Sequence, residues 1–205
     1  MNANHLPLHA LLLAAGRGSR FGGGKLQAEY RHRPLLTYPL ALIAAARNRG
    51  LVHGGYAVIP ADDEAVAGLV RDTKLEIVLN GAPERGLSFS LQLGLTAMAA
   101  GESAAALILL GDQPLVRLNV VEALISAWHA GGGAIIRPRY EASPDVPGHP
   151  VLVARSAWPL VQELREDAGF GSFGSRLPET VVEVAGHNPD VDTLDDLRTL
   201  EVLHQ

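Results

Sequence analysis

The sequence predicts an α/β protein in which helices cover a mostly parallel sheet. Short apolar runs, each the length of a buried strand, alternate with longer helix-like segments along the 205 residues, which is the pattern of such sheets. Hydrophobic residues make up 47% of the chain, so a globular core is expected. The length fits one domain, residues 1–205, and no linker, internal repeat or low-complexity tract divides it.

Strands are expected at the short apolar runs, and helices where apolar residues recur at helical spacing, as over 35–46. The expected strands are His9–Ala15, Gly55–Ile59, Leu75–Leu79, Ala105–Leu110, Ala134–Arg137, Pro150–Ala154 and Val181–Ala185. The expected helices are Pro34–Arg49, Asp62–Arg71, Leu87–Ala100, Asn119–Ala130, Trp158–Glu166 and Leu194–Leu203. Pro34 suits the first turn of its helix, and Asp62 suits an N-cap.

Composition excludes several classes of protein. A net charge of −5 without a long basic run argues against a nucleic-acid surface. Cysteine is absent, so disulfides, a thiolate nucleophile and cysteine-bound metal are excluded. No apolar stretch reaches the roughly 20 residues of a membrane helix. Met1–His9 lacks the basic and long apolar regions of a secretory signal, so we expect a soluble, cytoplasmic protein.

The loop Gly16–Lys25 follows the first strand and carries five glycines, two arginines and a lysine. Glycine lets backbone N–H groups approach an anion closely, and fixed cations neutralise that anion. The loop therefore predicts a nucleotide polyphosphate at the carboxyl end of a strand, where open α/β sheets bind ligands. A flexible turn is the alternative, and the bracketing charges of Arg20 and Lys25 make it the weaker reading.

Two familiar phosphate loops do not match this segment. A P-loop would need glycine at Ser19 and a hydroxyl residue at Leu26. The dinucleotide fingerprint would need glycine where Phe21 stands. The loop therefore indicates a different kind of phosphate site.

Asp112 comes directly after the apolar strand Ala105–Leu110, in Gly111-Asp112-Gln113-Pro114. A carboxylate at the end of a buried strand is costly unless a cation meets it. Mg²⁺ carried by a nucleotide is a natural partner, because one or two carboxylates usually hold it together with phosphate oxygens and water. The alternative is that Asp112 caps the following turn. Beside the glycine-rich loop, the metal interpretation leads.

Four acids lie within 190–196, just before the last predicted helix. Asp192 or Thr193 suits the N-cap, and the helix dipole explains Asp195 and Asp196, to which we assign no chemistry. Asp192 is the candidate for a second metal carboxylate, with Asp190 as its competitor.

Two further segments carry candidate binding residues. Ser88 begins the helix Leu87–Ala100, where hydroxyl and N–H donors suit an anion, although capping of the helix explains it equally well. His149 stands between Gly148 and Pro150 and opens a strand after a loop long enough to cover a substrate. A histidine in such a place is more often structural than catalytic.

Taken in order, these segments resemble the MobA-like nucleotidyltransferases, and among them the cytidylyltransferases of the molybdenum cofactor. The resemblance spans almost the whole chain. It rests on Leu13-Ala14-Ala15-Gly16, Ser19-Arg20-Phe21-Gly22, Lys25-Leu26, Gly86-Leu87-Ser88-Phe89-Ser90-Leu91, Leu110-Gly111-Asp112-Gln113-Pro114-Leu115, Gly148-His149-Pro150-Val151 and Asp190-Val191-Asp192-Thr193-Leu194-Asp195-Asp196-Leu197.

The resemblance implies one three-layer α/β/α, Rossmann-like domain with a mostly parallel mixed sheet, as in nucleotide-diphospho-sugar transferases. It implies a Mg²⁺-dependent enzyme that transfers a nucleotidyl group. Arg20, Lys25 and Asp112 are its expected catalytic residues, and Asp112 and Asp192 match the family's metal-site acids. His149 is expected at the acceptor. The expected nucleotide contacts are Leu13, Ala14, Ala15, Gly16, Gly18, Arg20, Lys25, Asn80 and Ser88.

In the implied reaction, a phosphate monoester of the acceptor attacks the α-phosphorus of a nucleoside triphosphate in line with departing pyrophosphate. The protein's task is then positioning and charge neutralisation. No general base is needed, since a phosphate is already ionised near neutral pH. In related guanylyltransferases the first loop generally reads Leu-Ala-Gly-Gly, whereas this chain reads Leu13-Ala14-Ala15-Gly16, with Ala15 in place of a glycine. The methyl group of Ala15 could narrow the cleft for the base and favour a pyrimidine, and one methyl group discriminates between two ligands by about 1–3 kcal/mol. We therefore expect CTP to be preferred over GTP.

The implied acceptor is a molybdopterin-type phosphate, with the loop Tyr140–His149 as a candidate wall of its pocket and a molybdoenzyme as a transient partner. The family usually has Met at Phe21 and a small residue at Phe89, and the segment 164–172 only partly follows the family pattern Gly-Asp-x-Gly-Ala-Arg. Two alternatives stay open. One is transfer to a sugar or polyol phosphate, and the other is a non-catalytic carrier of nucleotide or pterin cofactor.

Overall fold

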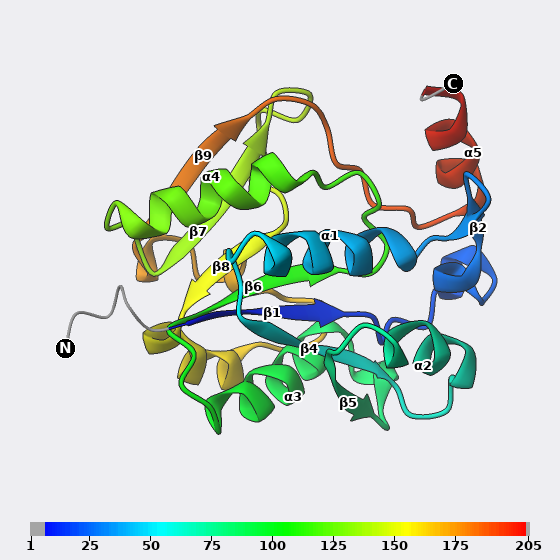
Figure 1. Cartoon of the computed structure of the whole chain (residues 1–205), viewed down its shortest axis with the longest axis horizontal. Coiled ribbons are helices and arrows are strands. Elements are labelled where there is room, and N and C mark those ends of the chain that lie inside the picture. The colour runs from blue at the N-terminus through cyan, green and yellow to red at the C-terminus, as the bar shows by residue number, and fades with distance from the viewer. Residues whose placement is uncertain (1–6, 204–205) are drawn as a thin grey trace.

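The computed structural model describes residues 7–203. Residues 1–6, most of the segment Met1–His9 discussed above, and residues 204–205 of the expected domain 1–205 lie outside that range. Within it, a seven-stranded sheet has the order β5-β4-β1-β6-β8-β7-β9, and β2 pairs with β3 in a separate hairpin (Figure 1). The strands are β1 (Leu8–Leu13), β2 (Glu29–Tyr30), β3 (Arg33–Pro34), β4 (Gly54–Pro60), β5 (Glu76–Asn80), β6 (Ala105–Leu110), β7 (Ile135–Tyr140), β8 (Val151–Ala154) and β9 (Glu179–Val184).

The sheet is mixed but mostly parallel, as expected. β5, β4, β1 and β6 run parallel to one another, and β9 is parallel to β7. Among the seven strands described in this sheet, only β8 runs antiparallel to its neighbours, β6 and β7. Because β1 and β6 are adjacent and parallel, the loops that follow Leu13 and Leu110 leave the same edge of the sheet.

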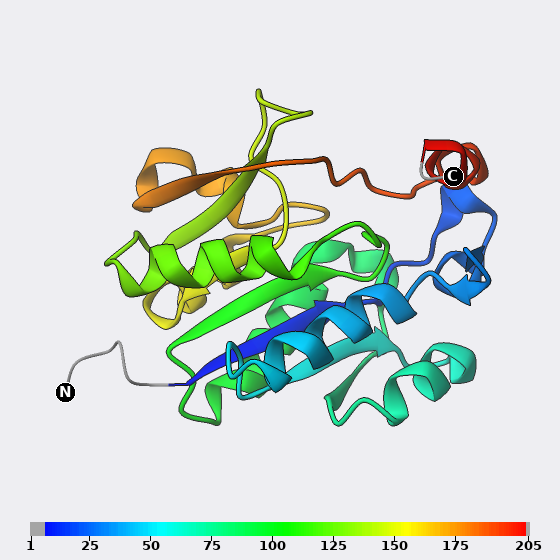
Figure 2. The ribbon, with the colours of Figure 1, turned by 45° about the horizontal axis from the view of Figure 1, so that its top comes forward.

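Helices cover both faces and make three layers. The helices are α1 (Thr37–Asn48), α2 (Glu64–Arg71), α3 (Leu87–Ala99), α4 (Leu118–His129) and α5 (Leu194–Leu203). α1, α2 and α4 share one apolar core with the sheet, and Figure 2 shows α1 and α4 lying along that face. α3 closes the other face with the 3₁₀ segments η5 (Arg155–Glu163) and η6 (Phe170–Arg176). Alternate residues of β1 point into the two cores, so the strand is buried on both sides.

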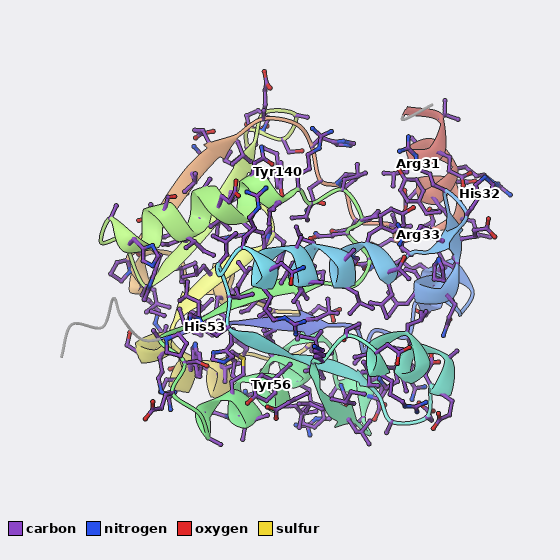
Figure 3. The ribbon with its side chains drawn as sticks, viewed as in Figure 1. Arg31, His32, Arg33, His53, Tyr56 and Tyr140 are labelled. Atoms are coloured by element: carbon purple, nitrogen blue, oxygen red, sulfur yellow. The ribbon has the colours of Figure 1, made fainter. Side chains whose placement is uncertain are left out.

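α5 stands apart from these layers, beside the β2–β3 hairpin and beyond the carboxyl end of β1 (Figures 1 and 2). A third apolar cluster joins it to the rest: Phe21, Tyr30, Leu35, Val191, Leu197 and Leu200. Figure 3 places Arg31, His32 and Arg33 at the tip of this hairpin.

Three local predictions are wrong. Asp63, not Asp62, caps α2, because its carboxylate accepts a bond from the backbone N of Val66. Pro34 lies in β3, and α1 begins only at Thr37. The segment predicted as a helix at 158–166 is a 3₁₀ segment that ends at Glu163; its internal Pro159 has no N–H to extend a regular α-helix. The described residues contain no helix long and apolar enough to cross a membrane.

Candidate active site

The glycine-rich loop folds into two 3₁₀ turns after β1, namely η2 (Ser19–Phe21) and η3 (Lys25–Gln27). Gly18 has φ 58°, and a Cβ there would lie 2.9 Å from the Cβ of Lys25. A side chain at this position would be strained in its backbone and would also displace Lys25. Gly18 therefore lets the loop close tightly enough to aim Lys25 at the end of β6.

Four charged residues from three distant segments of the chain meet at this loop. The Nζ of Lys25 lies 2.6 Å from Oδ2 of Asp112 and 3.1 Å from Oδ1 of Asp192. Nη1 of Arg20 lies 3.1 Å from the other oxygen of Asp192. The Lys25 side chain is only 10% exposed, whereas that of Arg20 is 76% exposed. Lys25 is thus the inner cation of the cluster and Arg20 the outer one.

The electrostatics favour a charged lysine in this cluster. Burial acts to lower the pKa of Lys25, but attraction and hydrogen bonds from Asp112 and Asp192 outweigh burial. The pKa of Lys25 is therefore raised above its ordinary value.

Asp192 reaches the loop because the segment before α5 is tied down at several points. The backbone N of Val191 donates to the carbonyl of Asp112, and the side chain of Val191 is buried in the cluster that contains Phe21. The carboxylate of Asp190, its competitor, instead accepts a 2.6 Å bond from Nε2 of Gln113. Of the two candidate acids, the structure therefore brings Asp192 to Lys25.

The remaining acids of this segment serve α5. Oδ2 of Asp196 accepts bonds from the backbone N and the hydroxyl of Thr193, while Thr193 Oγ1 accepts from the backbone N of Asp196. This reciprocal arrangement is a capping box, so Thr193 caps the helix. Hydrogen bonds from Thr193 lower the pKa of Asp196. Asp195 pairs with Arg198 on the surface.

A pocket of about 440 Å³ opens beside the loop. It is lined by Leu13, Ala15, Gly16, Arg17, Gly18, Ser19, Pro83, Glu84, Gly86, Leu87, Ser90, Leu110, Asp112 and Asp167. A second hollow, of about 360 Å³, lies across the Gly16–Arg17 turn, and Lys25 and Gln27 line it. Of these two spaces beside the loop, the one of about 440 Å³ is called the larger pocket below. The cation cluster thus borders two spaces large enough for parts of a nucleotide.

Three of the predicted nucleotide contacts, Ala14, Asn80 and Ser88, do not line the larger pocket. Ala14 is buried in the core that α1 covers. Asn80 is fully buried, where its Nδ2 donates to Ser90 Oγ and its Oδ1 accepts from the N of Ala82. Ser88 is buried, lines a separate hollow with Arg85 and Phe89, and makes no capping bond with its side chain. Asn80 therefore supports Ser90, which does line the larger pocket.

His149 lines neither of the two spaces beside the loop, although it is near enough to Asp112 to interact with its charge. Its carbonyl accepts bonds from the Tyr140 hydroxyl, labelled in Figure 3, and from Asn188, and its peptide bond to Pro150 is cis. Burial and the nearby Arg137 lower the pKa of His149 to about 4, with a smaller opposing effect of Asp112. The ring is therefore neutral at physiological pH.

Two residues that the sequence reasoning did not assign also line the larger pocket. Arg17 pairs with Glu84 across its mouth at 3.2 Å. Asp167 accepts a bond from the backbone N of Leu87 at the start of α3. The place of Arg17 in the glycine-rich loop was a usable signal. For Asp167, the partial match of segment 164–172 to the family pattern Gly-Asp-x-Gly-Ala-Arg was a usable signal, since Asp167 stands at the Asp of that pattern.

The donor set fits a divalent cation that arrives with phosphate ligands. Oδ1 of Asp112 is buried and has no hydrogen-bond partner among residues 7–203, so it is free to coordinate. Asp192 supplies a second carboxylate, which is bonded to the same Lys25 ammonium. No cluster of three or more His, Asp or Glu side chains in the described range suits a metal. Phosphate oxygens and water would therefore complete the coordination, as Mg²⁺ prefers.

The sheet and the helices that cover it have the fold of the α/β nucleotidyltransferases. The chain belongs to the MobA-like NTP transferase domain family, whose sequence profile matches residues 10–181. This membership confirms the resemblance to the MobA-like nucleotidyltransferases that the motifs indicated.

The chain is also similar to several known proteins. Rv0371c from Mycobacterium tuberculosis H37Rv is 26% identical, with a TM-score of 0.80 over 96% of this chain and 98% of that one. A structure of the same protein in complex with manganese has a TM-score of 0.77. CMP:2-keto-3-deoxy-manno-octonic acid synthetase complexed with CTP, only 15% identical, shares the fold with a TM-score of 0.72 over 96% of this chain and 98% of that one. The bifunctional enzyme IspD/IspF of Rhodospirillum rubrum is 35% identical over 132 residues, which are 62% of this chain and 33% of that protein. The match thus spans about a third of that relative's length.

Proposed function

We propose that this nucleotidyltransferase moves CMP from CTP onto the terminal phosphate of the molybdenum cofactor pterin, with release of pyrophosphate. The observation that carries the proposal is the convergence of Lys25 and Arg20 with Asp112 and Asp192 at a glycine-rich loop. Such a cluster suits a triphosphate, whose transfer to another phosphate demands neutralisation of two anions.

The residues divide the work by position. The backbone of Gly16–Lys25 and the side chains of Arg20 and Lys25 would bind the triphosphate and stabilise charge on departing pyrophosphate. Asp112 and Asp192 would hold Mg²⁺, which neutralises phosphate charge when bound. A phosphate nucleophile needs no general base, which agrees with the neutral state of His149 near Asp112.

Support for CTP comes from Ala15, which is buried and lines the larger pocket. Its methyl group narrows the space available to a base and disfavours a purine by about 1–3 kcal/mol. Thermal-shift titration with CTP, GTP, UTP and ATP in the presence of Mg²⁺ tests this preference. CTP should give the largest shift, and stabilisation by GTP alone would contradict the role of Ala15.

Support for a bulky acceptor comes from a further hollow, of about 510 Å³, whose lining includes residues that follow Asp112 shortly in the chain. Its lining joins Leu115 and Arg117 to Tyr140, Glu141 and Ala142, the first residues of the loop Tyr140–His149. Arg117 is not paired with a carboxylate in the described part of the chain. An apolar floor with a free guanidinium at its rim suits a ring system that carries a phosphate.

Pyrophosphate release measured with CTP and molybdenum cofactor, against a panel of sugar and polyol phosphates, tests the acceptor. Pyrophosphate release from CTP only when the molybdenum cofactor is the acceptor supports the proposal. Release with a sugar or polyol phosphate as the acceptor would instead support the alternative acceptor class. Asp112→Asn should lower the rate at least about 100-fold with the fold retained. A cofactor carrier would instead keep its function after this substitution. A cytoplasmic location and transient contact with a molybdoenzyme belong to the same proposal.

A further inference from the structure

Lys25 occupies the place between two carboxylates that the proposed metal needs. Its ammonium bonds one oxygen of Asp112 and one of Asp192, so it bridges acids that stand 80 residues apart in the sequence. Arg20 touches only the outer oxygen of Asp192. The inner faces of both carboxylates are therefore already met by one cation.

A divalent cation placed on these inner oxygens would lie beside a buried positive charge. Like charges repel strongly where water is largely excluded, and the Lys25 side chain is only 10% exposed. The ammonium and the metal thus compete for the same two acids. The buried Oδ1 of Asp112 is the one oxygen of that carboxylate that Lys25 leaves open.

The structure also offers Lys25 another position. Lys25 lines the hollow of about 360 Å³ together with Gly16, Arg17 and Gly24, the backbone expected to meet phosphate. Its four-carbon side chain is flexible, so the ammonium can turn toward that hollow while the backbone stays fixed. A triphosphate in the hollow would give the ammonium a new anionic partner.

We propose that Lys25 is a resident counter-ion, which holds Asp112 and Asp192 together while the site is empty. When the metal enters with the nucleotide, the Lys25 ammonium turns away from these two acids and pairs with the phosphates. This inference rests on the metal assignment of the proposed function. It makes Lys25 a positioning residue for the metal acids as well as a phosphate ligand. It follows that the protein binds a divalent metal poorly by itself, and that the metal and the nucleotide bind as one unit.

Binding of Mn²⁺ alone, followed by the loss of the free-ion signal in electron paramagnetic resonance without any nucleotide, tests this. The unaltered protein should bind Mn²⁺ weakly, and Lys25→Met should bind it at least tenfold more tightly, because the two acids then lack their inner cation. Arg20→Met is the matched control; it removes only the outer cation and should change Mn²⁺ affinity less than about threefold. Adding Asp112→Asn to Lys25→Met should abolish the gain.

The inference is overturned if folded Lys25→Met binds Mn²⁺ no more tightly than the unaltered protein. Should Lys25→Met be too unstable to titrate, Lys25→Gln, which keeps donors without the charge, is measured in the same way under the same criterion. Because no CTP or acceptor is present, this readout is independent of the transfer reaction. If Lys25→Met binds Mn²⁺ tightly but the unaltered protein transfers no cytidylyl group, the proposed function is rejected and the inference about Lys25 stands.

Discussion

Nε2 of Gln113 donates to Oδ1 of Asp190 across 2.6 Å, and this bond separates two acids that the sequence left in competition. With Asp190 engaged by Gln113, Asp192 is the neighbour whose carboxylate faces Lys25 and Arg20.

Asp192→Asn and Asp190→Asn are therefore a matched pair. Loss of charge at Asp192 should weaken Mg²⁺-dependent CTP binding at least tenfold, since one of two metal carboxylates is gone. Asp190→Asn keeps an acceptor for Gln113 and should change that affinity less than about threefold. Isothermal titration of both variants with CTP and Mg²⁺ makes the comparison, and equal losses would return Asp190 to the site.

Comparison of Gly18→Ala with Gly22→Ala distinguishes the effect of backbone strain from the effect of displacing Lys25. Both glycines have positive φ, 58° and 91°, but only a Cβ at Gly18 meets Lys25; at Gly22 no atom lies within 4 Å. Each substitution should cost about 1–2 kcal/mol of stability through its backbone. Gly18→Ala should in addition weaken CTP binding about tenfold. Denaturant unfolding and CTP titration measure the two effects, and an equal loss of affinity in both variants would contradict the close packing on Lys25.

Lowering the pH should destabilise the fold through His149. Unfolded, this histidine binds a proton near its ordinary pKa of 6.5, but folded only near a pKa of about 4. The unfolded state therefore binds more protons between these values, so stability falls as the pH drops from about 6.5 to about 4, by up to about 3 kcal/mol.

Unfolding free energies measured across that pH window test this for the unaltered protein and for His149→Gln. The variant should lose this part of the pH dependence. His32→Gln, at an imidazole that is 97% exposed, is the control and should keep it. Parallel curves for the unaltered protein and His149→Gln would show that burial does not perturb this ring.

Docking of α5 should matter to the site although α5 itself carries no proposed chemistry. Leu200 is 2% exposed in the cluster that also holds Phe21 and Val191, so Leu200→Ala should cost about 2–4 kcal/mol. It should also weaken Mg²⁺-dependent CTP binding, because the loop that carries Asp192 loses its support. Val202→Ala, at a side chain that is 71% exposed, should do neither. Unchanged CTP binding in folded Leu200→Ala would separate α5 from the site.

Local patterns in the sequence were enough to predict the layers of the fold and one half of the site. Short apolar runs mark β1 and β6, and the residues that follow them, Gly16–Lys25 and Asp112, had to share an edge once those strands were parallel neighbours. Errors were confined to ends and irregular pieces, such as the cap at Asp63 and the 3₁₀ segment around Pro159. There a single hydrogen bond or a missing N–H decides the boundary.

The sequence by itself determined a parallel sheet with a cationic glycine-rich loop and a strand-end acid, because backbone propensity and apolar spacing act over short distances. Only the tertiary structure decided that Asp192 meets Lys25, that Asn80 supports Ser90, and that Asp167 reaches α3. Except for the Asn80–Ser90 bond, these contacts join segments 80 or more residues apart. They depend on the packing of buried side chains such as Phe21 against Val191, and local sequence patterns do not encode such long-range packing.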